Sequence, residues 1–207
     1  MRAKEFLIEG RNHPVIVVDV QPAYCNKAHA AKCEQIINFV KKQTGPVLML
    51  VNAERDGTTD DTVAEIRQWW DKMAGGEYTS HIDWQRFQIA DKGYGYLRQW
   101  MDTDVPAAII IKVIRLLYQN KVSDTRELFG GYDSDEYETN MKALMGNSWR
   151  PWMKEDGIQV NWTSIAQLKR FSGAYLVGGG RDKCLREVEL LMNAFNIKYK
   201  RIDSLVY

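Results

Sequence analysis

The sequence predicts an α/β fold with a doubly wound, mainly parallel sheet, helices on both faces and a helical insertion. Three segments have the composition of buried strands: 14–20, 46–52 and 174–177. Each is rich in β-branched residues or leucine, is bounded by proline or glycine and shows little polar alternation, as in a sheet covered on both faces. Helical patterns alternate with these strands, which implies right-handed crossovers between parallel neighbours.

Apolar residues at helical spacing fill the gaps between and after these strands, in segments 28–42, 59–73 and 182–195. Asp60 and Asp61 fall in the first turn of the second segment, where acidic side chains favour a helix. Asn196 is suited to ending the third helix. Residues 87–91 form a further short strand-like stretch, and a last strand is expected at about 197–202.

The stretch from about 104 to 162 breaks this alternation. Asp104 and Pro106 predict a helix start, because proline fits the first helical turn. An apolar helical stripe follows, and after a polar, acidic stretch the pattern is helical again to about Met145. We expect a helical insertion within a single domain spanning 1–207, since this length suits one domain with a substantial core.

Composition excludes several classes of function. The net charge of +1 gives no broad electrostatic reason to expect nucleic acid or an anionic membrane as the partner. The first residues have the pattern of neither a secretion signal nor a membrane anchor, and the apolar runs are too short to span a bilayer. We therefore expect neither nucleic acid nor a membrane as partner.

Three cysteines are present: Cys25, Cys33 and Cys184. They form no CxxC pair and lack metal-finger spacing, so we expect no metal, and no cofactor is indicated. With no signal peptide, the pattern predicts a reduced, cytoplasmic protein. Cys33 lies on a helical stripe with Ile36 and Val40 and is expected to pack in the core.

Candidate chemistry falls at the carboxyl ends of strands, where open α/β sheets bind their ligands. Asp19 lies near the end of the first strand, Lys92 follows 87–91, and Cys184 begins a helix soon after 174–177. The positive end of the helix dipole and free N–H groups would lower the pKa of the thiol. A carboxylate can take the thiol proton, while a lysine balances the charges.

The glycine turn 178–180 admits more than one interpretation. Its N–H groups could point at a developing oxyanion, or the turn could bind phosphate at a helix N-terminus. It lacks both the dinucleotide GxGxxG pattern and the Walker ending. Each of the three residues also has an interpretation without any catalytic role: Cys184 as an inert thiol, Asp19 as a strand terminator and Lys92 as a solvated surface lysine.

At these same residues the chain resembles the isochorismatase-like cysteine hydrolases, which include the nicotinamidases. The first strand of that family ends in Asp-x-Gln, seen here as Asp19-Val20-Gln21. The family lysine with small and aromatic residues after it is similar to Lys92-Gly93-Tyr94-Gly95-Tyr96. The nucleophile turn is similar to Gly178-Gly179-Gly180-Arg181-Asp182-Lys183-Cys184. The resemblance covers about 14–100 and 164–203 and leaves the insertion unmatched.

The resemblance implies a catalytic triad of Asp19, Lys92 and Cys184. It also implies an oxyanion hole from the backbone N–H groups of Gly180 and Cys184, with an unusual cis peptide near Gly179-Gly180.

Gly179, Gly180, Gln21 and Arg181 are expected to bind the oxyanion or the substrate. Three features separate this chain from a typical nicotinamidase. Arg181 replaces the usual threonine, which would favour an anionic substrate. Residues 52–57 contain no histidine, so we expect no nicotinamidase metal cluster. We also expect the last helix and strand of the family to be absent, which leaves an incomplete sheet edge with room for a homo-oligomer.

The first functional hypothesis is a hydrolase that uses a cysteine nucleophile on an amide or related C–N bond of a small molecule. The alternatives are a catalytically inactive binding or interaction protein of the same fold, and a phosphate or nucleotide binder that uses the 178–180 turn. Aromatic residues are dense over 84–100 and 149–162. They indicate core or interface packing, or else a pocket wall with the insertion as its lid.

Overall fold

The computed structural model describes residues 12–52, 60–75, 82–92, 97, 100, 105–131, 135–154 and 157–207. Its centre is a five-stranded sheet with the order β3-β2-β1-β4-β5, in which every pair is parallel. The strands are β1 (Val15–Val18), β2 (Val47–Val51), β3 (Phe87–Asp91), β4 (Ala174–Gly178) and β5 (Tyr199–Val206). The predicted α/β class is confirmed, and the last strand starts later and runs further than expected.

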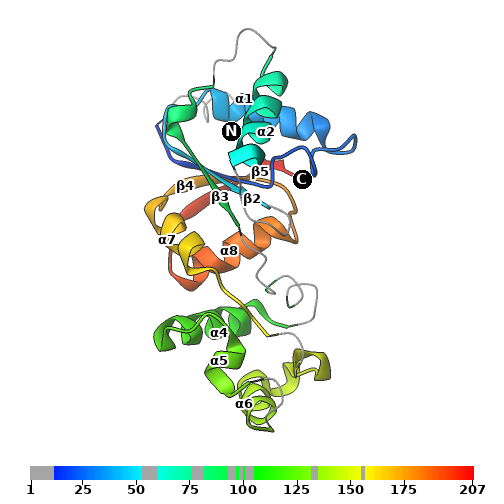
Figure 1. Ribbon diagram of the computed structural model, residues 1–207, viewed down its shortest axis with the longest axis vertical. Coiled ribbons are helices and arrows are strands. Elements are labelled where there is room, and N and C mark those ends of the chain that lie inside the picture. The colour runs from blue at the N-terminus through cyan, green and yellow to red at the C-terminus, as the bar shows by residue number, and fades with distance from the viewer. Residues whose placement is uncertain are drawn as a thin grey trace.

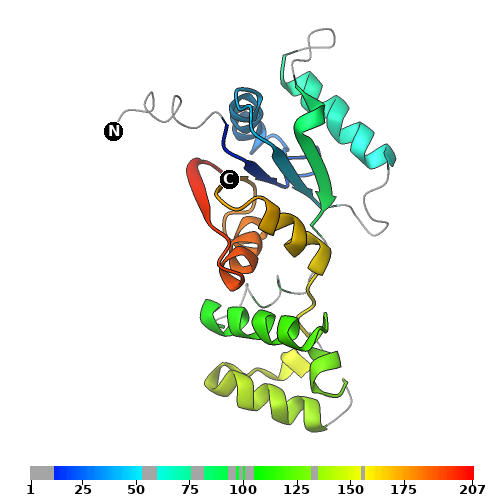
Figure 2. The same ribbon diagram turned by 90° about the vertical axis from the view of Figure 1, so that its left-hand side faces the viewer.

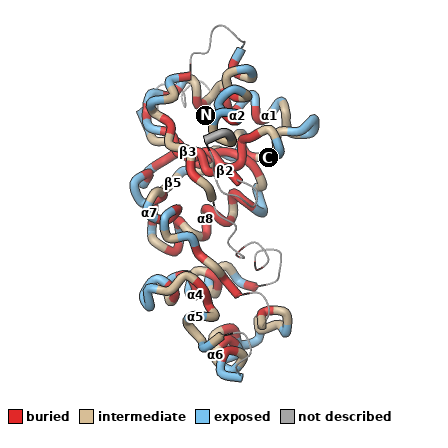
Figure 3. The backbone as a smooth tube through the Cα atoms, in the orientation of Figure 1, coloured by how far each residue is buried: buried red, intermediate tan, exposed pale blue. Residues whose placement is uncertain are grey.

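Helices cover both faces of this sheet (Figures 1 and 2). One face packs against α1 (Ala30–Lys41) and α2 (Asp60–Met73), and the other against α7 (Trp162–Arg170) and α8 (Cys184–Ala194). Successive residues of β1 point to opposite faces of the sheet, and all four are buried because helices cover both faces. The neighbouring strand β2 is likewise buried and is red in Figure 3. Burial on both sides explains why the strands lack polar alternation.

The predicted insertion forms a helical lobe on the α8 side of the sheet (Figure 1). It contains α4 (Ala107–Asn120), α5 (Thr125–Phe129) and α6 (Asp135–Met145), followed by the short 3-10 helices η3 (Gly146–Ser148) and η4 (Pro151–Lys154). The lobe has its own apolar core, which α8 shares through Leu190 and Ala194. The guanidinium of Arg115 also donates to the carbonyl oxygen of Ala194 at 2.8 Å.

Local signals set several helix ends. Pro106 stands immediately before α4 in an extended conformation, one position earlier than the first-turn position expected. Asn196 adopts a positive φ of 54° just after α8, and the N–H of Ile197 donates to the Met192 carbonyl at 2.9 Å. Helix α7 was not anticipated; Asn161 caps it by accepting from the N–H groups of Thr163 and Ser164.

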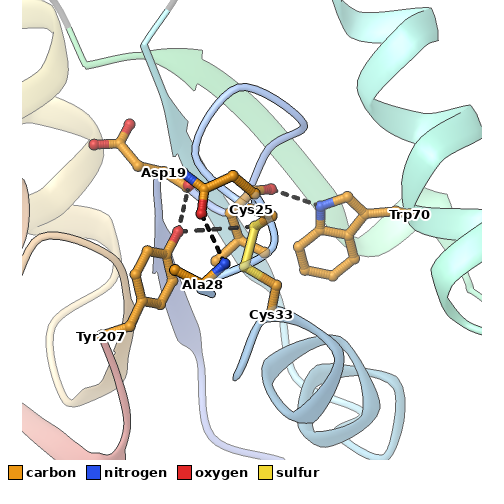
Figure 4. The surroundings of a disulfide bond; sticks show 8 residues. Asp19, Cys25, Ala28, Cys33, Trp70 and Tyr207 are labelled. Carbon is orange, nitrogen blue, oxygen red and sulfur yellow. Dashed lines mark hydrogen bonds between the residues drawn. A yellow bond between two sulfur atoms is a disulfide. The ribbon is translucent and has the colours of Figure 1, made fainter. Parts of the chain in front are cut away.

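The expectation of three reduced thiols is wrong: Cys25 and Cys33 form a disulfide (Figure 4). The loop after β1 folds back against the first turns of α1, which brings two cysteines eight positions apart into contact. Cys33 is fully buried on the predicted stripe, so it both packs and crosslinks. No helix among the described residues is long and apolar enough to cross a membrane.

The disulfide predicts a measurable loss of stability on reduction. Closing this short loop should contribute about 2.5 kcal/mol to the free energy of unfolding, largely through the unfolded chain. Urea denaturation of the oxidised protein and of the Cys25→Ser/Cys33→Ser double variant measures the difference. Thiol titration of the unreduced, denatured protein should find Cys184 alone; titration of all three cysteines would contradict the pairing.

Candidate active site

The site forms where β1 and β4 lie side by side, which is the switch point in the strand order. Strand β1 ends opposite Gly178 of β4. The chain beyond each end is held by backbone hydrogen bonds: the N–H of Asp19 donates to Leu50 at 2.9 Å, and the N–H of Gly179 donates to Val18 at 2.8 Å. Asp19 and the glycine turn therefore meet at the sheet edge where open α/β folds place their ligands.

Asp19 and Lys92 form a buried ion pair at this edge. The Lys92 ammonium donates to Asp19 Oδ2 at 2.8 Å, and the two side chains are only 7% and 2% exposed. Burial acts to lower the pKa of Lys92, but the charges of Asp19, Cys184 and Glu187 outweigh it and hold that pKa well above its usual value. Lys92 is therefore a buried cation, and its interpretation as a solvated surface lysine is wrong.

The thiol of Cys184 stands at the first position of α8, is 7% exposed and is free. Its pKa lies above the usual value, opposite to the direction that the helix N-terminus predicts. Burial is the largest cause, the charge of Asp19 adds to it, and the charge of Lys92 opposes both. The resting sulfur is consequently a thiol, which needs a base before it can attack.

One oxygen of Asp19 is available to act as that base. Oδ2 accepts from Lys92, whereas Oδ1 is buried and has no hydrogen-bond partner in the described structure. An unpaired buried carboxylate oxygen is costly, and such groups are uncommon away from functional sites. Asp19 and Cys184 line the same cavity, so Oδ1 is suited to receive the thiol proton.

The glycine turn owes its shape to positive φ angles. Gly178 and Gly180 have φ values of 124° and 65°, a region that side chains disfavour. A Cβ would strike the backbone of Val18 at Gly178, the ring of Tyr207 at Gly179 and the backbone nitrogen of Cys184 at Gly180. The expected cis peptide near Gly179-Gly180 is wrong, because the described residues contain no cis bond.

Two backbone donors of this turn have no acceptor. The carbonyl of Gly180 accepts from the N–H groups of Lys183 at 2.8 Å and Leu185 at 3.0 Å. The N–H groups of Gly180 and Cys184 themselves donate to no atom among the described residues. Free donors at the start of a helix are where an oxyanion would bind. They are the same two groups that the family resemblance implies.

These groups open onto a cavity of about 410 Å³. Of the substrate-binding residues expected from the sequence, Gly179, Gly180 and Arg181 line it. Gln21 does not; its amide exchanges two hydrogen bonds with the backbone of Asn52, at 3.0 and 2.9 Å, which ties the β1 loop to the end of β2. Residues 93–96, part of the motif that begins at Lys92, lie outside the described residues.

The remaining walls come from side chains that the sequence did not single out. They are mainly residues of the β1 loop and the end of the chain: Ala23, Tyr24, Asn26, His29, Asp182, Lys183 and Tyr207. Asp182 and Lys183 belong to the nucleophile turn quoted from the sequence, and the others belong to no recognisable local motif. Glu187 was also missed; it is buried one helical turn after Cys184, and its charge acts on Lys92.

No described tryptophan lines the cavity, which favours packing over the pocket-wall interpretation. Trp84 packs on Trp70 and Phe87, and Trp100 packs on Trp152 within the lobe. No group of three or more histidine, cysteine or acidic residues that could hold a metal ion occurs in the described part of the chain. The stretch 53–57 lies outside it.

Comparisons with known proteins found no family model, no curated protein and no solved structure that matches this chain.

Two glycines, one just before β4 and one at its end, give a matched test of the turn. Gly173 and Gly178 both have positive φ, but a Cβ at Gly173 meets no atom within 4 Å. Gly173→Ala should cost about 1–2 kcal/mol for the left-handed conformation alone. Gly178→Ala should cost at least about 3 kcal/mol because it also collides with β1. Equal losses in urea denaturation would contradict this account.

The pKa of Cys184 gives a pH test. Asp19→Asn removes the charge that raises it and keeps an oxygen for Lys92, and asparagine tolerates the positive φ of 53°. The midpoint of Cys184 alkylation by iodoacetamide against pH should lie above about 8.5 in the wild type and fall in the variant. Asp182→Asn is the control, since that exposed carboxylate is screened by solvent. An unchanged or higher midpoint in Asp19→Asn contradicts the coupling.

Proposed function

We propose that this chain is a cysteine hydrolase of the isochorismatase-like kind, acting on an amide or related C–N bond of a small molecule. One observation carries the proposal: a buried thiol shares its cavity with a buried carboxylate oxygen that has no partner. A nucleophile, a base and two free backbone donors thus surround one cavity. This is the arrangement that acyl transfer requires.

In the first half-reaction, Asp19 Oδ1 takes the proton of the Cys184 thiol as the sulfur attacks the substrate carbonyl. The carbonyl oxygen gains the negative charge, which the N–H groups of Gly180 and Cys184 stabilise. The C–N bond then breaks, and Asp19 returns the proton to the leaving nitrogen. A thioester on Cys184 and a free amine or ammonia result.

Hydrolysis of the thioester uses the same groups. Asp19 accepts a proton from water as the hydroxyl attacks the acyl carbon, and the two N–H groups again hold the oxyanion. The C–S bond breaks, and the sulfur recovers its proton from Asp19. Lys92 keeps its charge throughout, because its pKa is far above neutrality, and its hydrogen bond to Oδ2 holds the Asp19 side chain in place.

The cavity suits a small substrate that carries negative charge. The cavity volume is at the lower end of the range for small-molecule sites. Arg181 and Lys183 are exposed at the edge of the cavity, so a substrate carboxylate would find cations there.

The nucleophile is tested by Cys184→Ala and Cys184→Ser. Both variants should lose turnover of a panel of small primary amides and anilides by at least about a thousandfold, while circular dichroism and the thermal midpoint stay near those of the wild type. Intact-mass analysis during turnover should find an acyl adduct on Cys184. The Cys25→Ser/Cys33→Ser double variant keeps Cys184 and is the control for removing cysteines other than Cys184. Full activity of Cys184→Ala would refute the proposal.

A further inference from the structure

We infer that Tyr207 is a positioning residue for this site, holding the backbone of Asp19 with its hydroxyl and the glycine turn with its ring and main chain. The inference rests on the proposed function for its kinetic consequences, but its geometry is independent of any substrate. Tyr207 follows β5, and no sequence motif marks it.

The main chain of Tyr207 closes onto the glycine turn from both sides. Its N–H donates to the Gly178 carbonyl at 3.2 Å, and its carbonyl accepts from the N–H of Arg181 at 2.9 Å. Pairing between β4 and β5 shifts register just before this point, so that Gly178 stands opposite Val206. Tyr207 thereby continues the pairing past the strand ends and fixes the residues that bracket Gly179 and Gly180.

The side chain of Tyr207 reaches the end of β1 (Figure 4). Its hydroxyl donates to the Asp19 backbone carbonyl at 2.8 Å. The ring lies where a Cβ on Gly179 would be, and stacks on His29 with the centroids 4.7 Å apart. The Cys25 sulfur lies 3.8 Å from the same hydroxyl. The phenol therefore joins two segments: the disulfide-linked loop after β1, which it contacts at Asp19, Cys25 and His29, and the glycine turn.

The hydroxyl acts on the reaction through Asp19. Asp19 has a left-handed φ of 53°, which must be held by its neighbours. Its N–H is fixed by Leu50, while its carbonyl accepts from the Gln21 N–H at 3.1 Å and from Tyr207. Without the phenol, one of the two donors to that carbonyl is lost. The carboxylate can then turn away from the thiol without any loss of fold.

Burial raises the pKa of the Tyr207 phenol, and the charges of Asp19 and Cys184 raise it further. The hydroxyl therefore stays protonated and remains a donor across the pH range of the experiments. A pH effect seen on replacing it reports on Asp19 and Cys184, not on titration of the phenol itself.

Tyr207→Phe separates the hydroxyl from the ring. The ring contacts stay, so the thermal midpoint should change little. Turnover of a small amide should show kcat reduced by about tenfold with KM unchanged, because misplacing a general base removes part of its contribution. The midpoint of Cys184 alkylation by iodoacetamide should fall toward about 8.5, since the Asp19 charge moves away from the thiol.

The controls distinguish positioning from simple stabilisation. In an Asp19→Asn background, Tyr207→Phe should shift the alkylation midpoint no further, because the charge it positions is gone. Tyr199→Phe, at the start of β5 with its hydroxyl bonded to Asn193, should leave both midpoint and kcat at wild-type values. Tyr207→Ala removes the ring as well and should raise KM in addition to lowering kcat.

Two outcomes would overturn the inference. One is a Tyr207→Phe protein with the wild-type alkylation midpoint, whatever happens to its thermal stability. The other is a midpoint shift of equal size in the Asp19→Asn background. If the wild type hydrolyses none of the amides, the proposed function fails, but the alkylation series still decides whether Tyr207 positions Asp19.

Discussion

The buried ion pair between Asp19 and Lys92 sets the electrostatics of the whole site. Two charges withdrawn from water cost several kcal/mol each unless they meet at close range with good geometry, and 2.8 Å between nearly inaccessible groups meets that condition. The charge of Asp19 raises the pKa of the Cys184 thiol, and the charge of Lys92 lowers it. The three groups are therefore electrostatically coupled.

Several features around this pair lower stability, and they gather at one end of the sheet. Asp19 holds a positive φ and an unpaired oxygen, and the N–H groups of Gly180 and Cys184 have no acceptor among the described residues. Each is a cost that a merely structural turn would avoid. The apolar strands, which are buried on both faces, offset these costs to the stability of the domain. Concentrated strain of this kind is expected where a site is built before its ligand arrives.

The sequence predicted the sheet and the approximate place of the site because both depend on local patterns. Strands such as 47–51 are apolar throughout, and the carboxyl ends of parallel strands converge at one edge, so Asp19, Lys92 and Cys184 could be placed there. The direction of the Cys184 pKa was predicted wrongly, since burial and the Asp19 charge outweigh the helix terminus. Neither effect can be read from neighbouring residues.

The disulfide and Tyr207 were missed for a related reason. Each depends on how a loop folds back in three dimensions, and nothing in the spacing of Cys25 and Cys33 distinguishes a crosslink from two buried thiols. Tyr207 lies 188 positions from Asp19 and carries no motif. The Tyr207 hydroxyl contacts Asp19 at its backbone carbonyl, and a contact to the backbone leaves no pattern of side chains in the sequence.

The helical lobe reaches the site through α8, not through the cavity. None of its described residues lines that cavity, which weighs against a lid. Helix α8 instead spans two cores: Leu185, Val188 and Met192 pack on the sheet, while Leu190 and Ala194 pack in the lobe. Cys184 begins this helix. A helix that packs on two cores has little freedom to rotate or slide, so the lobe helps to fix the position of Cys184, while Tyr207 holds the backbone of Asp19.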